Sequence, residues 1–131
     1  VGHALLNFDG MRPGLTVDAG GHTIETWAEA YRPTTADVVV AYDNGPLAGK
    51  AAIVRNGNVT SIGAWSDDLV RATLRDVLSD AGVATLDLPD GLRISRRGGL
   101  EIWTNFNETE ITLPNGTKLG PVSYVINPSQ S

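Results

Sequence analysis

Paired carboxylates are the residues of this 131-residue chain whose types and spacing come nearest to hydrolytic chemistry. A retaining glycosidase requires two carboxyl groups about 5 Å apart, one acting as acid and the other as nucleophile. Glu25 and Glu29 share a predicted strand face, but strand rise separates them by about 13 Å. The other pairs, which are simpler to explain as solvated or capping groups, are Glu108 with Glu110 and Asp67 with Asp68. No catalytic residue is therefore predicted.

Metal-ligand and nucleophile patterns are also missing from the sequence. His3 and His22 have no His, Cys or carboxylate at a recognised ligand spacing. There is no cysteine, which excludes disulfides, thiolate catalysis and cysteine-based zinc sites. Asp43-Asn44-Gly45 resembles the start of a calcium loop, but Pro46 follows and the spacing is wrong, so a turn is predicted. We expect no metal and no cofactor.

The three tryptophans, Trp27, Trp65 and Trp103, leave two interpretations open. Aromatic rings pack on pyranose faces, so these side chains could form a sugar-stacking platform. They could instead anchor a core or an interface, and this second interpretation is favoured. Trp65 directly precedes a predicted helix start and is well placed to fix that helix on a sheet.

Charge and hydropathy exclude several partners. The formal net charge of −5 disfavours nucleic acid, and the basic cluster Arg93, Arg96 and Arg97 is interpreted as solvated surface. No stretch approaches the roughly 20 apolar residues of a membrane helix, and no signal-peptide pattern precedes Asp9. The lack of cysteine fits a reducing cytoplasm, which is the expected location. Because Val1 is not Met, a processed product or a fragment is expected.

Most of the elements that must position these side chains are strands, and one helix is predicted over residues 66–81. Ser66 can cap it, and Asp67 with Asp68 places negative charge in its first turn. Gly82 supplies the left-handed residue that ends many helices. The apolar stripe expected to lie on a sheet consists of Val70, Leu74, Val77, Leu78 and Ala81.

Three strand patterns precede the helix. Residues 49–55 and 58–64 predict a hairpin joined by Asn56-Gly57. The run Val38-Val39-Val40 within 36–42 predicts a strand buried on both faces. Residues 22–31 alternate as one strand, with Trp27 on the glutamate face, so part of that face must be covered.

A change in composition at residues 87–91 predicts a linker or tight turn, after which the chain is all β in character. The predicted strands are 92–96, 100–105, 110–113 and 122–126. A β meander of about 45 residues buries too little surface for independent folding, so we expect this part to pack against a neighbouring domain. The Asn-x-Thr sequons, interpreted as turn chemistry, begin at Asn58, Asn107 and Asn115. The predicted fold class is α+β and mostly β: a sheet with one main amphipathic helix over 1–86, then a small antiparallel β domain over 87–131.

Short motifs occur in a fixed order between residues 25 and 126. They are Trp27-Ala28-Glu29, Ala36-Asp37-Val38, the segments 42–50 and 52–56, Ala81-Gly82-Val83, the segment 88–92, Arg96-Arg97-Gly98-Gly99 and Asn105-Phe106-Asn107. In this order they resemble the C-terminal part of bacterial β-galactosidases of glycoside hydrolase family 42.

That resemblance implies a parent with three parts. A TIM barrel carries two catalytic Glu residues, an α/β domain similar to class I glutamine amidotransferases mediates trimer formation in many members, and a small antiparallel β domain follows. Residues 1–86 would be the rear portion of the trimerisation domain, and 87–131 the terminal β domain. The barrel would lie upstream, so no catalytic residue of the family can be assigned to this chain.

Three hypotheses follow. The first is a non-catalytic segment of a β-galactosidase, serving oligomer assembly and structural support beside the TIM barrel of the same parent, with galactoside bound only through that parent. The second is a free-standing carbohydrate-binding β module that uses Trp65 or Trp103. The third is a structural or interaction domain unrelated to sugars.

Overall fold

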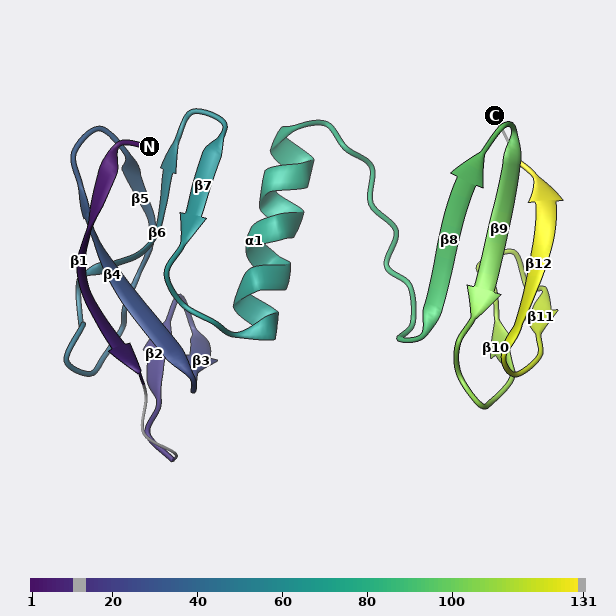
Figure 1. Cartoon of the computed structure of the whole chain (residues 1–131), viewed down its shortest axis with the longest axis horizontal. Coiled ribbons are helices and arrows are strands. Elements are labelled where there is room, and N and C mark those ends of the chain that lie inside the picture. Colours follow the sequence, from purple (N-terminus) through teal and green to yellow (C-terminus); the bar gives the residue numbers. More distant parts are fainter. Residues whose placement is uncertain (11–13, 130–131) are drawn as a thin grey trace. The chain divides into compact units, whose positions relative to one another are not determined.

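The computed structural model describes residues 1–10 and 14–129, and the chain divides into two compact units (Figure 1). The N-terminal unit is Val1–Thr85 and the C-terminal unit is Leu86–Ser131. The strand pairings given for the described residues are antiparallel, and there is one main helix. The predicted fold class, mostly β with one helix, is confirmed.

A five-stranded sheet forms the body of the N-terminal unit. Four strands follow the order β1-β4-β6-β5, and β7 pairs with β6. Their bounds are β1 His3–Gly10, β4 Trp27–Pro33, β5 Asp37–Ala41, β6 Ala51–Asn56 and β7 Val59–Ile62. A separate hairpin joins β2 Val17–Ala19 to β3 His22–Ile24. β1 and the β2–β3 hairpin were not anticipated from the sequence.

The predicted single strand over residues 22–31 is wrong, because the chain breaks at residues 25–26 and its two halves join different sheets. The alternation itself is real: Ile24, Ala28 and Ala30 are buried. Thr26, expected on the same face, is exposed in the break. The alternation of apolar and polar residues predicts which face each residue occupies, but it does not show that the chain moves from one sheet to another.

The predicted burial of the valine run on both faces is also wrong. β5 stands at the edge of the five-stranded sheet, and the side chains of Val38 and Val39 are about half exposed, at 51% and 50%. Only Val40 packs against the core of the unit. A β-bulge between Val38 and Val40 disrupts the alternation there.

The hairpin between β6 and β7 is confirmed, with its turn one residue later than predicted. Asn56 pairs with Val59, so the two loop residues are Gly57 and Asn58. Only Gly57 of these two has a positive φ, 57°, which matches a type II′ turn with glycine first.

The predicted helix is α1, Asp67–Asp80. Ser66 occupies the N-cap position with an extended backbone, although its side chain makes no capping hydrogen bond. At the other end Gly82 has φ 68°, its N–H donates to the Ser79 carbonyl, and the Val83 N–H donates to the Leu78 carbonyl. This pair of bonds is the Schellman arrangement, so the glycine stop is confirmed.

The buried face of α1 differs from the predicted stripe. Leu69 and Thr73 are the buried residues of the helix, whereas Leu74 is 51% exposed and Ala81 is also exposed. Periodicity treated threonine as polar, but the Thr73 hydroxyl donates to the Leu69 carbonyl at 2.8 Å and so can be buried. The helix is therefore rotated from the orientation that the apolar pattern predicts.

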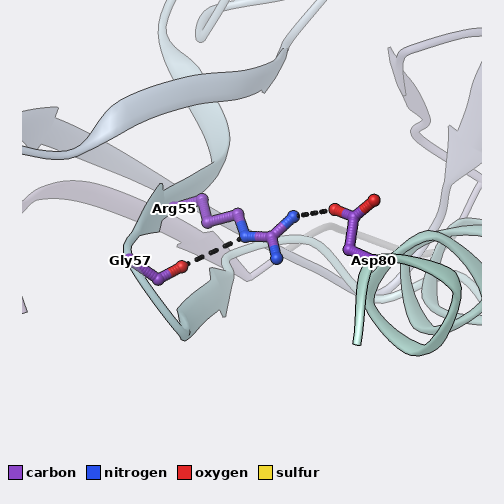
Figure 2. Close-up of polar contacts among 3 residues, drawn as sticks. All are labelled: Arg55, Gly57 and Asp80. Carbon is purple, nitrogen blue, oxygen red and sulfur yellow. Dashed lines mark hydrogen bonds and ion pairs between the residues drawn. The ribbon is translucent and has the colours of Figure 1, made fainter. Parts of the chain in front are cut away.

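An ion pair connects the end of α1 to the β6–β7 hairpin (Figure 2). The Arg55 guanidinium donates to the Asp80 carboxylate, and its Nε donates to the Gly57 carbonyl at 3.3 Å. The pairing places a positive charge beside an acidic residue at the C-terminus of the helix, where the helix dipole is unfavourable for acid.

The core of the N-terminal unit is rich in alanine. Five alanines, each at most 3% exposed, form one cluster with larger side chains such as Ile24, Ile53 and Leu69. They are Ala19, Ala28, Ala30, Ala52 and Ala64. Small side chains let the sheet and its covering elements approach closely.

The C-terminal unit holds a three-stranded sheet in the order β12-β9-β8 and a two-stranded β10–β11 ribbon. The bounds are β8 Leu92–Arg97, β9 Leu100–Asn105, β10 Ile111–Thr112, β11 Lys118–Leu119 and β12 Ser123–Pro128. Four predicted strands are thus confirmed, and β11 was missed. The core cluster consists of Leu92, Trp103, Leu113 and Leu119.

Within the described residues, the helix of this chain is too short and polar to cross a membrane.

Candidate functional site

The three tryptophans have different environments. Trp65 is 60% exposed in the segment between β7 and α1, and Trp27 is partly exposed at the start of β4. The two are backbone neighbours, because the Trp65 N–H donates to the Trp27 carbonyl at 3.1 Å. Trp103 belongs to the other unit, where it is only 6% exposed and part of the core. The tertiary structure therefore brings Trp27 and Trp65 together in one unit.

A surface pocket of about 580 Å³ adjoins Trp65. Its volume lies within the range of small-molecule sites. Apart from Gly21 and the indole, the lining is polar and comes from β3, from the break before β4 and from the start of α1: His22, Thr23, Glu25, Thr26, Ser66, Asp67 and Asp68. One aromatic ring beside hydroxyl and carboxylate groups is a combination able to contact a sugar.

Sequence spacing did not place Glu25 beside Asp67 and Asp68, which are about forty residues away along the chain. All three side chains are exposed. The juxtaposition supplies carboxylate oxygens that can accept hydrogen bonds at the rim of the pocket.

Glu108 and Glu110, a carboxylate pair noted in the sequence, have different surroundings. Glu110 accepts a hydrogen bond from Lys118 Nζ at 2.8 Å across the β10–β11 region, and this ion pair raises the pKa of Lys118. Glu108 lies in the exposed turn before β10. Both residues are accounted for as surface groups.

Among residues 1–10 and 14–129, no cluster of three or more His, Asp or Glu side chains has the arrangement of a metal site. His3 stacks edge-on against Tyr31 with ring centroids 4.7 Å apart. His22 lines the Trp65 pocket.

The Asp43-Asn44 turn has a structural role, as predicted. Asn44 Nδ2 donates to the Asp18 carboxylate at 2.6 Å, and the Asp18 N–H donates to Asn44 Oδ1 at 2.8 Å. The Gly21 N–H donates to Asp43 Oδ2 at 2.9 Å. These bonds tie the β2–β3 hairpin to the loop after β5.

Two tyrosines and Glu29 form a polar cluster that sequence reasoning missed. The buried Tyr42 hydroxyl donates to the Glu29 carbonyl at 2.7 Å and contacts the Gly63 carbonyl at 3.2 Å. The Tyr31 hydroxyl donates to Glu29 Oε2 at 3.2 Å. Burial, reinforced by the Glu29 charge, raises the pKa of Tyr31 to about 12 and raises the pKa of Tyr42 as well. Both phenols therefore stay protonated at neutral pH. The Tyr42 hydroxyl, which follows β5, links that segment to β4 and to the residue after β7, whereas the Tyr31 hydrogen bond lies within β4.

Asn105 organises the loops of the C-terminal unit. Its side chain is 1% exposed, and Nδ2 donates to the carbonyls of Thr109, Leu119 and Gly120 at 2.8, 3.3 and 2.9 Å. Oδ1 accepts from the Asn107 N–H at 2.9 Å. The Asn105-Phe106-Asn107 motif thus satisfies buried backbone groups.

The sequons and the arginine cluster have the surface roles predicted for them. Asn58 is a loop residue, and Asn115 Oδ1 accepts from the Thr117 N–H at 3.0 Å within a turn. Arg96 pairs with Glu101 at 2.8 Å, and Arg93 and Arg97 are exposed.

Trp103 also borders a pocket, together with Arg96, Glu101 and Asn127. Its ring packs in the core, and Nε1 donates to Glu101 Oε2 at 3.3 Å. Little of the ring faces outward, so the geometry favours an anchoring role over a stacking platform.

The described residues form two mostly antiparallel β units, and the first of them carries an exposed tryptophan beside a polar pocket. No family model matches the chain. It is 42% identical over 112 residues to the β-galactosidase Bga of Halorubrum lacusprofundi and 36% identical over 111 residues to the β-galactosidase BgaH of Haloferax lucentense. Each match covers 80% of this chain but only 16% and 17% of the relative, so the chain spans about one sixth of their length.

Solved structures agree. The β-galactosidase of the haloarchaeon Halorubrum lacusprofundi superposes with a TM-score of 0.82 at 32% identity, over 98% of this chain and 23% of that one. Gan42B, a β-galactosidase of glycoside hydrolase family 42, shares the fold with a TM-score of 0.65 at 15% identity, over 99% of this chain and 22% of its own. The resemblance to the C-terminal part of family 42 β-galactosidases is confirmed. A bacterial origin is not, because both of the relatives named are haloarchaeal.

Proposed function

We propose that this chain is a non-catalytic segment of a β-galactosidase that serves oligomer assembly and structural support, while the hydrolysis of β-D-galactosides takes place on a TIM barrel in the same parent. The observation that carries the proposal is the 42% identity to a β-galactosidase of which the match covers only 16%. Catalytic side chains would then lie in the remaining part of the parent. A cytoplasmic location is part of the proposal, with which the cysteine-free sequence is compatible.

Within this proposal the two units correspond to different domains of the parent. The N-terminal unit corresponds to the rear portion of the trimerisation domain, over residues 1–86, and the C-terminal unit to the terminal β domain, over 87–131. Half-exposed apolar side chains at the sheet edges support the assembly role, because large exposed apolar surface marks interaction sites. Those residues are Leu5 and Leu6 on β1 and Val38 and Val39 on β5.

A segment exchange tests the proposal. The Halorubrum lacusprofundi enzyme is prepared intact, without its matching segment, and with residues 1–131 of this chain in place of that segment. We expect the truncated enzyme to lose hydrolysis of a galactoside and its native oligomeric state in sedimentation, and the chimera to regain both. This chain alone should hydrolyse no galactoside. Activity of the isolated chain, or a chimera no better than the truncated enzyme, would contradict the proposal.

The alternative function, a carbohydrate-binding module, is favoured by one observation: the exposed Trp65 ring beside a polar pocket. It predicts that galactose quenches or shifts the tryptophan fluorescence of the isolated chain. Trp65→Ala should abolish that response, and the matched change Trp27→Ala should leave it. A chain that gives no response to galactose would remove this alternative.

A further inference from the structure

Within the C-terminal unit, the unit's own core residues pack on one face of the three-stranded sheet, and no residue of that core cluster lies on the other face. Side chains of a strand alternate between faces, and the register pairs Ile94 with Trp103 and Trp103 with Val125 on the packed side. The intervening positions form the other side. We call its apolar part, on β9 and β12, the apolar sheet face: Leu100, Ile102, Tyr124 and Ile126.

The apolar sheet face is continuous across two strands. Ile102 pairs directly with Ile126, and Thr104 pairs with Tyr124. Tyr124 is 68% exposed and Ile126 50% exposed. Paired apolar side chains on an antiparallel sheet normally face a core, while the solvated face alternates with polar residues. On this side of β9 and β12 Thr104 is polar, and the other positions are apolar or aromatic.

The chain at one end of this face holds a second unusual feature. Val122, 73% exposed, has φ 43°, and it is the one non-glycine residue with a positive φ in the part of the chain that the structure describes. A β-branched residue rarely adopts this conformation. Continuing the register would place it opposite Phe106, which is 65% exposed. A strained backbone conformation persists where neighbouring contacts hold it. At this position the side chains of Val122 and Phe106 are both largely exposed.

The third strand adds charge. By register, Arg93 lies beside Thr104 and Arg97 beside Leu100, so both belong to the same side of the sheet. Both are exposed. A surface that complements this side of the sheet is therefore apolar opposite β9 and β12 and acidic opposite β8.

We infer that the apolar sheet face docks on the part of the parent polypeptide that lies outside residues 1–131, against an apolar surface with a carboxylate opposite Arg93 or Arg97. The inference rests on the proposed function. The match covers 23% of the solved Halorubrum lacusprofundi β-galactosidase, so most of such a polypeptide lies outside this chain and is covalently tethered to it. Tethering makes an intramolecular partner the favoured occupant. Among the described residues, the hydrophobic core cluster of the C-terminal unit has four buried side chains, and so small a core also favours support from a neighbour.

The test compares amide hydrogen exchange of β9 and β12 in the segment-exchange chimera and in the isolated chain. The variant is Tyr124→Ser with Ile126→Ser, and the control is Glu108→Ser, a change at an exposed turn of the same unit. In the chimera we expect the double variant to raise exchange in these strands about tenfold or more, because the docked face is lost. In the isolated chain the same double change should leave exchange within about twofold, as should the control in both contexts.

The outcomes separate the two ideas. A chimera without activity or assembly, before any face variant is made, contradicts the proposed function and this inference together. An active chimera in which the double variant exchanges like the parent chimera overturns this inference alone. Sedimentation identifies a third result: an isolated chain that dimerises, and becomes monomeric with Tyr124→Ser and Ile126→Ser, would assign the face to a second copy and also overturn it.

Discussion

The two units bury their sheets with different kinds of core. In the N-terminal unit a hairpin and the rest of the unit enclose a core of alanines and branched side chains, and Leu69 of α1 belongs to it. In the C-terminal unit a short ribbon covers one face of three strands, and the core cluster is Leu92, Trp103, Leu113 and Leu119. The buried surface of the first core is divided among many small side chains, whereas the second core depends on one large ring.

This contrast explains where polar groups are buried. Tyr42 donates to the Glu29 carbonyl and contacts the Gly63 carbonyl, while Asn105 donates to three carbonyls in the loops. A buried donor with partners fixes one arrangement of the chain around it, because an unpaired group costs free energy. Each unit therefore has one polar anchor in addition to its apolar core.

The largest effect should come from removing the dominant ring of the smaller core. Trp103→Ala is expected to destabilise the C-terminal unit by about 3–5 kcal/mol and unfold it, because that unit has few other buried side chains. Amide exchange should lose protection over residues 92–128 and keep it in β4 and β6. The control Trp65→Ala, at an exposed ring, should leave both units protected. Equal loss in the two units would show that they fold together and break the comparison.

The tight core of the N-terminal unit should resist an added methyl group. At Gly63 a Cβ would lie 2.6 Å from the Glu29 carbonyl oxygen, where the Glu29 N–H donates to the Gly63 carbonyl at 2.5 Å. Gly63→Ala is therefore expected to cost about 1–3 kcal/mol in urea unfolding of that unit. Gly120→Ala, whose nearest atom would be 3.8 Å away, is the matched control and should cost much less. Equal costs at the two sites would contradict the packing argument.

The tyrosine cluster should make the N-terminal unit sensitive to alkali. Burial raises the pKa of Tyr31 from 10.0 to about 12, and that of Tyr42 is raised too. Above pH 10 the folded state then binds more protons at these tyrosines than the unfolded state does. Their contribution to the free energy of unfolding is therefore fully present below pH 10 and is lost as the pH rises through about 12, the pKa of Tyr31 in the folded state. Urea unfolding at increasing pH measures this slope. Tyr42→Phe should reduce it and cost about 1 kcal/mol at neutral pH. A slope unchanged by that substitution would assign the alkaline transition to other groups.

The smallest effect is expected at the ion pair drawn in Figure 2. Arg55 and Asp80 have side chains that are 33% and 57% exposed, so solvent screens their attraction. Asp80→Asn should cost about 0.2–1 kcal/mol, and the difference should shrink in high salt. Asp68→Asn, at the opposite end of α1, is the control for a general change in charge. A large loss of stability that does not depend on salt would mean that the hydrogen bond of the pair, and not its charge attraction, holds α1 in place.

Much of the secondary structure could be predicted because the signals were local. Gly82 ends α1, Gly98-Gly99 turns β8 into β9, and the Asn56–Asn58 segment turns β6 into β7. Each depends on a few adjacent residues and the φ that glycine permits. The candidate site could not be predicted in the same way, because Glu25 and Asp67 meet at the Trp65 pocket through the fold and not through spacing.

Two of the errors share one cause. The valine run and the helix stripe were both predicted to be buried, but Leu74, Val38 and Val39 are about half exposed. The predicted stripe consisted of Val70, Leu74, Val77, Leu78 and Ala81. Hydropathy records that a side chain is apolar but not which neighbour covers it. An edge strand or an outward helix face has the same pattern as a buried one.

The sequence by itself determined the class of fold, the helix and most of the strands, because these depend on local geometry and residue chemistry. The tertiary structure decided which faces are covered. It rotated α1 onto Leu69 and Thr73, split the strand before Trp27, and left Leu100, Tyr124 and Ile126 exposed. Burial is a property of contacts between distant segments, and such contacts exist only once the chain has folded.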